Sequence, residues 1–112
     1  MALIPGNESY TVVFCTAPSD LAASMSEILV RERLAACINR LPVESSYIWD
    51  EDLCNDKETL MIIKTTTHAL PALRKRIYEI HSYEVPEIIA IPVIFGTEGY
   101  LGWVRENTSI PE

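Results

Sequence analysis

Apolar positions along the chain follow two different periods, and their order predicts alternating strands and helices. Short segments rich in β-branched and aromatic residues, such as SYTVVFCT over 9–16, predict strands that are apolar on both faces. A proline inside such a segment favours an edge strand or a bulge, which we expect at Pro92. The strands are expected over 9–16, over 37–49 with a break at Pro42, over 58–66 and over 87–94.

Apolar residues at helical spacing predict three helices between and after these strands. The first is expected to run to about residue 34, the second to Ile80 and the third over 97–107. Side-chain oxygens just before a helix can accept hydrogen bonds from the free N–H groups of its first turn. We therefore expect caps at Ser19 or Asp20, at Thr67 and at Thr97.

The elements follow one another as β-α-β-β-α-β, with a further helix at the C-terminal end. Two β-α-β units with right-handed crossovers, each leaving room for a strand of the other, give the split arrangement of ferredoxin-like folds. A length of 112 residues suffices for a single hydrophobic core. We therefore predict one α/β (α+β) domain over 1–112, a ferredoxin-like sandwich in which residues 1–8 are flexible.

The second and third strands, joined by an acidic turn at Asp50, Glu51 and Asp52, are long for a domain of this size. A hairpin of this length should project beyond the two helices that cover the sheet. Its apolar residues then need another covering surface, and exposed strand edges with apolar faces recruit partner chains. A second copy of the chain is the simplest cover, so we expect a homo-oligomer.

The charge balance narrows the choice of partners. The chain has 9 Lys and Arg against 16 Asp and Glu, a formal net charge of −7. Nucleic acids and anionic membranes bind positive surfaces, so we expect neither as a partner.

The start of the chain lacks the pattern of a signal peptide. The cysteines Cys15, Cys37 and Cys54 lie far apart, which is typical of reduced thiols, and we expect a cytoplasmic protein.

Six segments give the chain a resemblance to the CutA family of divalent-ion tolerance proteins. They are CTAPSD over 15–20, ERLAACIN over 32–39, SSYIW over 45–49, KTT over 64–66, HSYEVPEIIAIPV over 81–93 and YLGWV over 100–104. The resemblance implies a homotrimer of ferredoxin-like subunits whose long hairpins pair between chains. It also implies copper binding in a response to divalent metal ions. Contacts in the homotrimer are expected at Tyr47, Trp49, Tyr100 and Trp103.

Two segments depart from the family pattern. The family usually has a glycine in the hairpin turn after the tryptophan, where this chain has the acidic residues 50–52. The His-Pro-Tyr of the family reads His81-Ser82-Tyr83 here, which loosens the backbone beside the histidine. The first departure leaves the conformation of the turn open.

The predicted topology places four residues with metal-binding side chains at one edge of the sheet. The first strand ends where the second helix ends and where the third and fourth strands begin, which brings together Cys15, His81, Glu58 and Glu87. Sulfur and nitrogen donors favour copper or zinc over magnesium or calcium. The resemblance implies a copper-binding role for Cys15 and His81 only, and the two glutamates follow from topology. A buried Cys15 as a small core residue and His81 as a partner of the helix dipole are the structural alternatives.

Three classes of function fit these residues. The first is a copper-binding or other divalent-metal protein with no catalytic turnover. The second is a non-catalytic trimeric signalling or scaffold module that resembles PII-type regulators, although the glycines form no phosphate-binding loop. The third is an enzyme with Cys15 as nucleophile and His81 as base. No orienting partner or oxyanion donor is evident for such a pair, so we expect no enzymatic activity.

Overall fold

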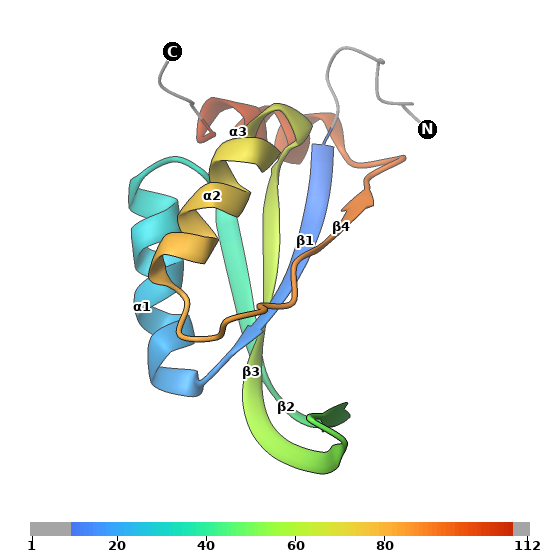
Figure 1. Cartoon of the computed structure of the whole chain (residues 1–112). Coiled ribbons are helices and arrows are strands. Elements are labelled where there is room, and N and C mark those ends of the chain that lie inside the picture. The colour runs from blue at the N-terminus through green and yellow to red at the C-terminus, as the bar shows by residue number, and fades with distance from the viewer. Residues whose placement is uncertain (1–9, 109–112) are drawn as a thin grey trace.

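A computed structural model describes residues 10–108, which form one four-stranded sheet and three α-helices (Figure 1). The flexibility expected for residues 1–8 falls outside the described residues. The elements are β1 (Tyr10–Ala17), α1 (Ser19–Arg31), β2 (Cys37–Trp49), β3 (Asp52–Thr66), the 3₁₀ turn η1 (Thr67–Ala69), α2 (Leu70–Ile80), β4 (Ile89–Pro92) and α3 (Glu98–Glu106).

The strands lie in the order β2-β3-β1-β4, and each pair of neighbours is antiparallel. Cys15 in β1 lies opposite Met61 in β3, and Phe14 lies opposite Ile89 in β4. This order confirms the expected ferredoxin-like arrangement. It also brings the end of β1, the end of α2 and the start of β4 to the same edge, as the sequence predicts.

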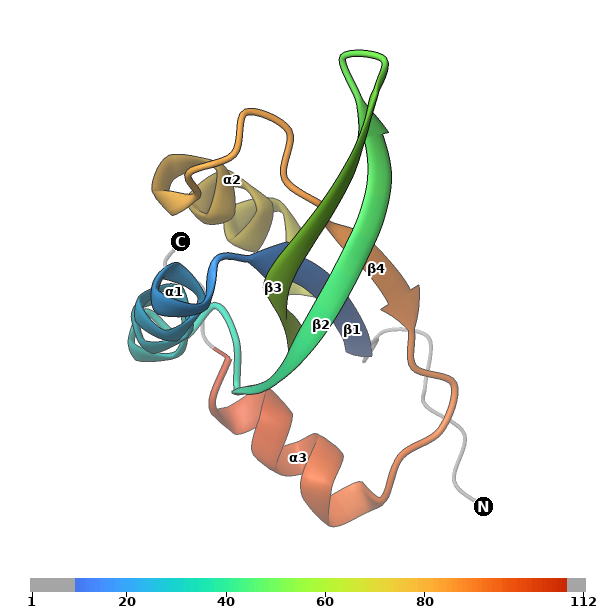
Figure 2. The same cartoon turned by 90° about the horizontal axis from the view of Figure 1, so that it is seen from below.

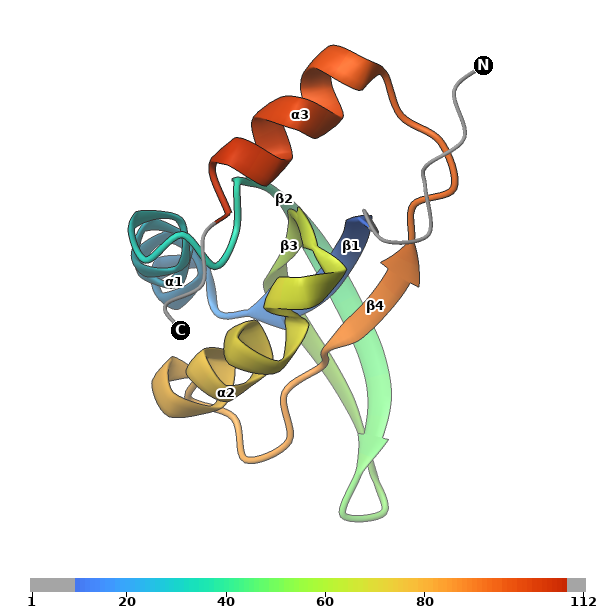
Figure 3. The ribbon, with the colours of Figure 1, turned by 90° about the horizontal axis from the view of Figure 1, so that it is seen from above.

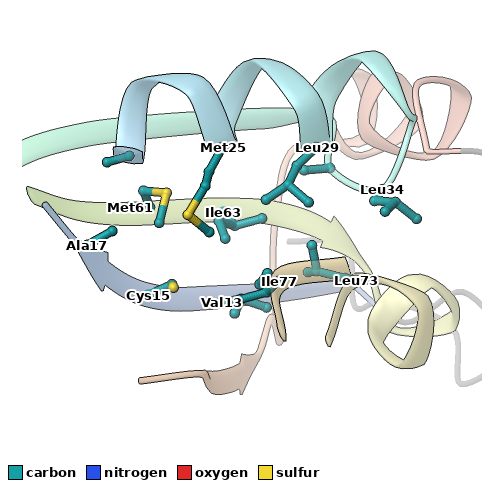
Figure 4. Packing of buried hydrophobic residues seen from close by; sticks show 12 residues of the cluster. Val13, Cys15, Ala17, Met25, Leu29, Leu34, Met61, Ile63, Leu73 and Ile77 are labelled. Carbon is teal, nitrogen blue, oxygen red and sulfur yellow. The ribbon is translucent and has the colours of Figure 1, made fainter. Parts of the chain in front are cut away.

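Helices α1 and α2 cover one face of the sheet, and the core lies between them and the strands (Figures 3 and 4). Alternate residues of β1 and β3 point to this side, since successive side chains of a strand face opposite ways. The largest core residues are Val13, Cys15, Met61 and Ile63 from the sheet and Met25, Leu29, Leu73 and Ile77 from the helices.

Helices α1 and α2 do not cover the opposite face of the sheet (Figure 3), and this face carries apolar side chains. Val12 and Phe14 alternate with the core residues of β1 and are half-buried. Their partners across the β1–β4 pair, Ile91 and Ile89, are exposed. This face therefore remains an apolar surface in the single chain.

Strands β2 and β3 form a hairpin that extends well beyond the rest of the sheet (Figure 2). The two strands stay in register from the pair of Cys37 with Lys64 to the pair of Trp49 with Asp52. The expected break at Pro42 is wrong: β2 continues through it, because an edge strand can turn a missing N–H toward solvent.

Two strand lengths also differ from the prediction. β3 begins at Asp52, six positions before the expected start at residue 58, since its polar first half pairs with β2. β4 is limited to Ile89–Pro92, where it pairs with β1.

The hairpin turn consists of Asp50 and Glu51, and both have left-handed backbone conformations, with φ of 50° and 69°. A two-residue hairpin loop of type I′ requires positive φ at both positions. The expected acidic turn is therefore confirmed, except that Asp52 already belongs to β3. The left-handed conformation is unfavourable for side chains with a Cβ, so this turn forms without the glycine that would suit it.

The predicted caps of the first two helices are wrong, because the N-cap residues of α1 and α2 are Pro18 and Ala69. Thr97 is the N-cap residue of α3, as predicted, but its side chain makes no capping hydrogen bond. The Ser19 hydroxyl instead accepts a hydrogen bond from Thr59 in β3, at 3.0 Å. Helix α1 ends at Arg31 rather than near residue 34, because Arg33 has a φ of 63° that turns the chain toward β2. None of the helices within residues 10–108 has the length and apolar content needed to cross a membrane.

Candidate functional site

His81 follows the last residue of α2 and connects that helix to the end of β1. Its Nε2 lies 2.8 Å from the carbonyl oxygen of Thr16, and its Nδ1 lies 3.0 Å from the backbone nitrogen of Tyr83. A carbonyl oxygen can only accept and a backbone N–H can only donate. These partners therefore assign the proton to Nε2 and leave Nδ1 as the acceptor.

Cys15 lies in the core beside this histidine and has no solvent-exposed surface. Burial, followed by the negative charges of Glu87 and Glu58, raises the pKa of its thiol from 9.0 to about 12. Among residues 10–108 the thiol has one hydrogen bond, a long one of 3.9 Å to the carbonyl oxygen of Thr16. The thiol is therefore protonated at neutral pH.

Tyr83 connects His81 to Glu58. Its ring packs against the imidazole, with 4.6 Å between the ring centroids, and its hydroxyl donates to Glu58 Oε2 at 2.7 Å. Burial, followed by the hydrogen bond to Glu58, raises the pKa of the Tyr83 hydroxyl well above its ordinary value. Sequence reasoning did not assign this role to Tyr83, although its position two residues after His81 was a signal for it.

A cleft of about 770 Å³ lies between the far half of the hairpin and the loop that connects α2 to β4. Figure 2 shows the path of this hairpin and of this loop. The hairpin contributes polar and aromatic residues, and the loop contributes most of the carboxylates. The lining residues are Thr16, Ser45, Ser46, Tyr47, Trp49, Glu58, Ser82, Tyr83, Glu84, Val85 and Glu87.

The predicted metal-binding residues lie at the edge where topology placed them, but no three of their side chains converge on one point. Glu58 and Glu87 are close enough to Cys15 to shift the pKa of its thiol, and His81 contacts the residue after Cys15. Within residues 10–108, no group of three or more His, Cys, Asp or Glu side chains is arranged to hold a metal ion. A role of Cys15, His81, Glu58 and Glu87 in metal binding stays a prediction.

The four residues expected at contacts between subunits are accessible in the single chain. Tyr47, Trp49, Tyr100 and Trp103 are between 41% and 48% exposed. Three of them make local contacts: the Tyr47 hydroxyl donates to Asp56 across the hairpin, and the rings of Tyr100 and Trp103 pack together on α3. Their contact with another chain stays a prediction.

The sequence pattern of the family described as CutA1 divalent ion tolerance protein matches residues 11–107. This match includes both strands of the hairpin, the segment 81–88 and helix α3. The chain belongs to the CutA1 family. The ferredoxin-like subunit and the relation to divalent cations are therefore properties of the family to which it belongs.

Individual CutA relatives support this assignment. A divalent-cation tolerance protein CutA from Thermus thermophilus is 48% identical over 99 residues, which cover 87% of this chain and 96% of that protein. The human protein CutA is 41% identical over 107 residues, which cover 94% of this chain but 59% of the human protein. This chain therefore spans less than two thirds of its human relative.

Solved CutA structures have the same fold. The Thermus thermophilus structure matches with a TM-score of 0.86 at 45% identity, covering 89% of this chain and 99% of that one. A periplasmic divalent cation tolerance protein CutA from Archaeoglobus fulgidus gives 0.87 at 32% identity, with coverages of 89% and 99%. A PII-like protein CutA from Nostoc, in apo form, gives 0.85 at 30% identity, with coverages of 88% and 97%.

Proposed function

We propose that this CutA1-family protein binds copper at the edge formed by Cys15 and His81, and that it acts in divalent-ion tolerance as a homotrimer without catalytic turnover. The observation that carries the proposal is that the end of α2 lies against the end of β1. There His81 is hydrogen-bonded to Thr16, the residue after Cys15, and the charges of Glu87 and Glu58 act on the Cys15 thiol. Sulfur, nitrogen and carboxylate oxygen donors are thus supplied from three separate elements.

The chemistry of these donors fits copper or zinc better than magnesium or calcium. Nδ1 of His81 carries no proton, and its lone pair accepts the backbone N–H of Tyr83, so it is the nitrogen that a metal ion would take. Binding there requires the backbone N–H of Tyr83 to move away. It also requires the Cys15 thiol to lose a proton that its pKa of about 12 retains at neutral pH. These two costs predict modest affinity, with Glu58 or Glu87 as a source of oxygen ligands.

Calorimetric titration with copper tests the site, using the wild type, Cys15→Ala and His81→Ala. His68→Ala is the matched control, because His68 is exposed at the start of η1, away from the edge. We expect the two site variants to bind at least about tenfold more weakly than the wild type and the control. Identical binding by all four proteins would show that copper, if bound, is held elsewhere.

The homotrimer rests on the apolar surface that the single chain leaves exposed. Ile89 and Ile91 on β4, together with Ile48 and Leu53 near the tip of the hairpin, are exposed large hydrophobic residues. Exposed apolar residues at these two places, β4 and the tip of the hairpin, mark interaction sites. Light scattering after size-exclusion chromatography should give three times the chain mass of 12.6 kDa. A monomer at micromolar concentration would contradict the assembly.

The alternative, a signalling or scaffold module that resembles PII-type regulators, is supported by likeness of fold alone. An increase in melting temperature on adding a nucleotide would favour it.

A nucleophilic role for Cys15 is opposed by its buried, protonated thiol, since reactive cysteines have a lowered pKa and partial exposure. In the native protein we expect iodoacetamide to modify Cys37 and Cys54, which are half-buried, before Cys15. Three unpaired cysteines also support placing this protein in the cytoplasm.

A further inference from the structure

The cleft between the hairpin and the α2–β4 loop combines carboxylates with aromatic rings. Its wall holds the carboxylates of Glu58, Glu84 and Glu87 and the rings of Tyr47, Trp49 and Tyr83, and no Lys, Arg or His of residues 10–108 belongs to it. Tyr47 and Trp49 are also expected at contacts between subunits, so the cleft adjoins a subunit contact in the proposed homotrimer. We propose that this cleft binds an organic ammonium ion, such as one end of an alkyl diamine, with Glu58 as its principal counter-ion.

Glu58 is the one carboxylate of the wall that is buried. Only 7% of the residue is exposed, and Oε2 accepts the hydroxyl proton of Tyr83. Oε1 receives no hydrogen bond from any residue within 10–108. In that part of the chain no fully buried side-chain oxygen lacks a partner, so Oε1 is open to the cleft.

A buried carboxylate is stable only when its charge is compensated. A neutral phenol satisfies one oxygen of Glu58 but supplies no positive charge. The neighbouring Lys57 is exposed and does not belong to the wall of the cleft. A cation that enters the cleft would supply that charge, and an ammonium group can donate directly to Oε1.

The aromatic rings favour an organic cation over a bare metal ion. Metal ions need several converging ligands, and the described residues offer no such group. An alkylammonium ion instead gains from the faces of aromatic rings as well as from carboxylates. A cleft of about 770 Å³ is also large for a bare ion and is of a size that holds a small organic molecule.

This site shares Glu58 and Glu87 with the copper site proposed above and differs from it in its other groups. The ammonium ion uses Oε1 of Glu58 and the aromatic wall, and it needs neither the thiol of Cys15 nor Nδ1 of His81. Variants at Cys15 and Glu84, which belong to one site each, therefore distinguish the two proposals.

Calorimetric titration of the full chain with 1,4-diaminobutane at constant ionic strength tests the inference, with 1,4-butanediol as the neutral match. The wild type should bind the diamine saturably, once per chain, and should not bind the diol. Glu58→Gln should weaken diamine binding roughly tenfold. Glu84→Gln, at an exposed position of the same wall, should weaken it about threefold.

Glu27→Gln is the control for net charge, because Glu27 is exposed on α1 and lies outside the cleft. It should bind the diamine as the wild type does. Equal weakening by Glu27→Gln and Glu84→Gln, or no saturable binding by the wild type, would overturn the proposal even if Glu58→Gln did not fold. Cys15→Ala should keep diamine affinity, and Glu84→Gln should keep copper affinity, so a loss confined to one ligand identifies which proposal fails.

Discussion

His81 donates a hydrogen bond from Nε2 to the carbonyl oxygen of Thr16 at 2.8 Å, across 65 positions of sequence. This bond fastens the end of α2 to the end of β1. Because Nδ1 of the same ring accepts from the backbone of Tyr83, the imidazole also fixes the start of the loop that leads to β4. One side chain thus positions three elements around the candidate site.

His81→Ala should destabilise the fold by about 1–2 kcal/mol, because it removes both hydrogen bonds of a half-buried ring. Urea unfolding followed by circular dichroism measures the change. The exposed His68, replaced by alanine in the same way, should change stability by less than about 0.5 kcal/mol. Equal stability of the two variants would mean that the bond to Thr16 contributes nothing.

Stability should fall in alkaline solution because of Cys15. Its thiol has a pKa of about 12 in the fold, against 9.0 when unperturbed, so the folded state retains a proton that the unfolded chain releases. The stabilisation is therefore complete below pH 9 and is lost as the pH rises toward about 12. The loss is about 1.4 kcal/mol per pH unit in that window.

Cys15→Ala removes this dependence. The variant should lose about 1 kcal/mol at pH 7 through a small cavity, yet its unfolding free energy should decline less steeply above pH 9 than that of the wild type. Denaturant titrations at several pH values give both slopes. Parallel slopes would show that another group causes the alkaline loss.

Glu51→Gly should stabilise the hairpin by about 0.5–1 kcal/mol, since φ at this position is 69° and glycine adopts that conformation without a Cβ penalty. The melting temperature is the measurement. Glu44→Gly, in the extended middle of β2, is the matched control and should destabilise instead. A lower melting temperature for Glu51→Gly would contradict a left-handed turn residue.

Thr65→Val should destabilise the protein by about 1–2 kcal/mol. The Thr65 hydroxyl is buried and donates to the carbonyl oxygen of Leu34 at 2.7 Å, so valine of similar shape leaves that oxygen unsatisfied. Thr66→Val, one position later on the same strand, is the control, because its hydroxyl makes no hydrogen bond within residues 10–108. Similar effects of the two substitutions would assign the cost to the loss of any hydroxyl in β3.

Sequence patterns predicted strands and helices correctly where buried positions recur at the regular spacing of a strand or a helix. Val13 and Cys15 alternate with half-buried residues as a two-sided strand requires, and the stripes of α1 and α2 face the core. The errors lie where a local preference competes with tertiary contacts. By local rules Pro42 should interrupt its strand, but β2 is an edge strand, where the missing N–H of proline costs no hydrogen bond within the sheet. The Ser19 hydroxyl accepts a hydrogen bond from Thr59 instead of capping its helix.

The order of strands and helices follows from the amino-acid sequence alone, because periodic burial and turn residues are local properties. That order also determines which residues reach one edge of the sheet. Three features are visible only in the folded structure. They are the protonation of His81 at Nε2, the hydrogen bond from Tyr83 to Glu58 and the exposure of that carboxylate to a cleft. These features depend on contacts between residues 25 and 65 positions apart, whose distances are set by the path of the loop after α2.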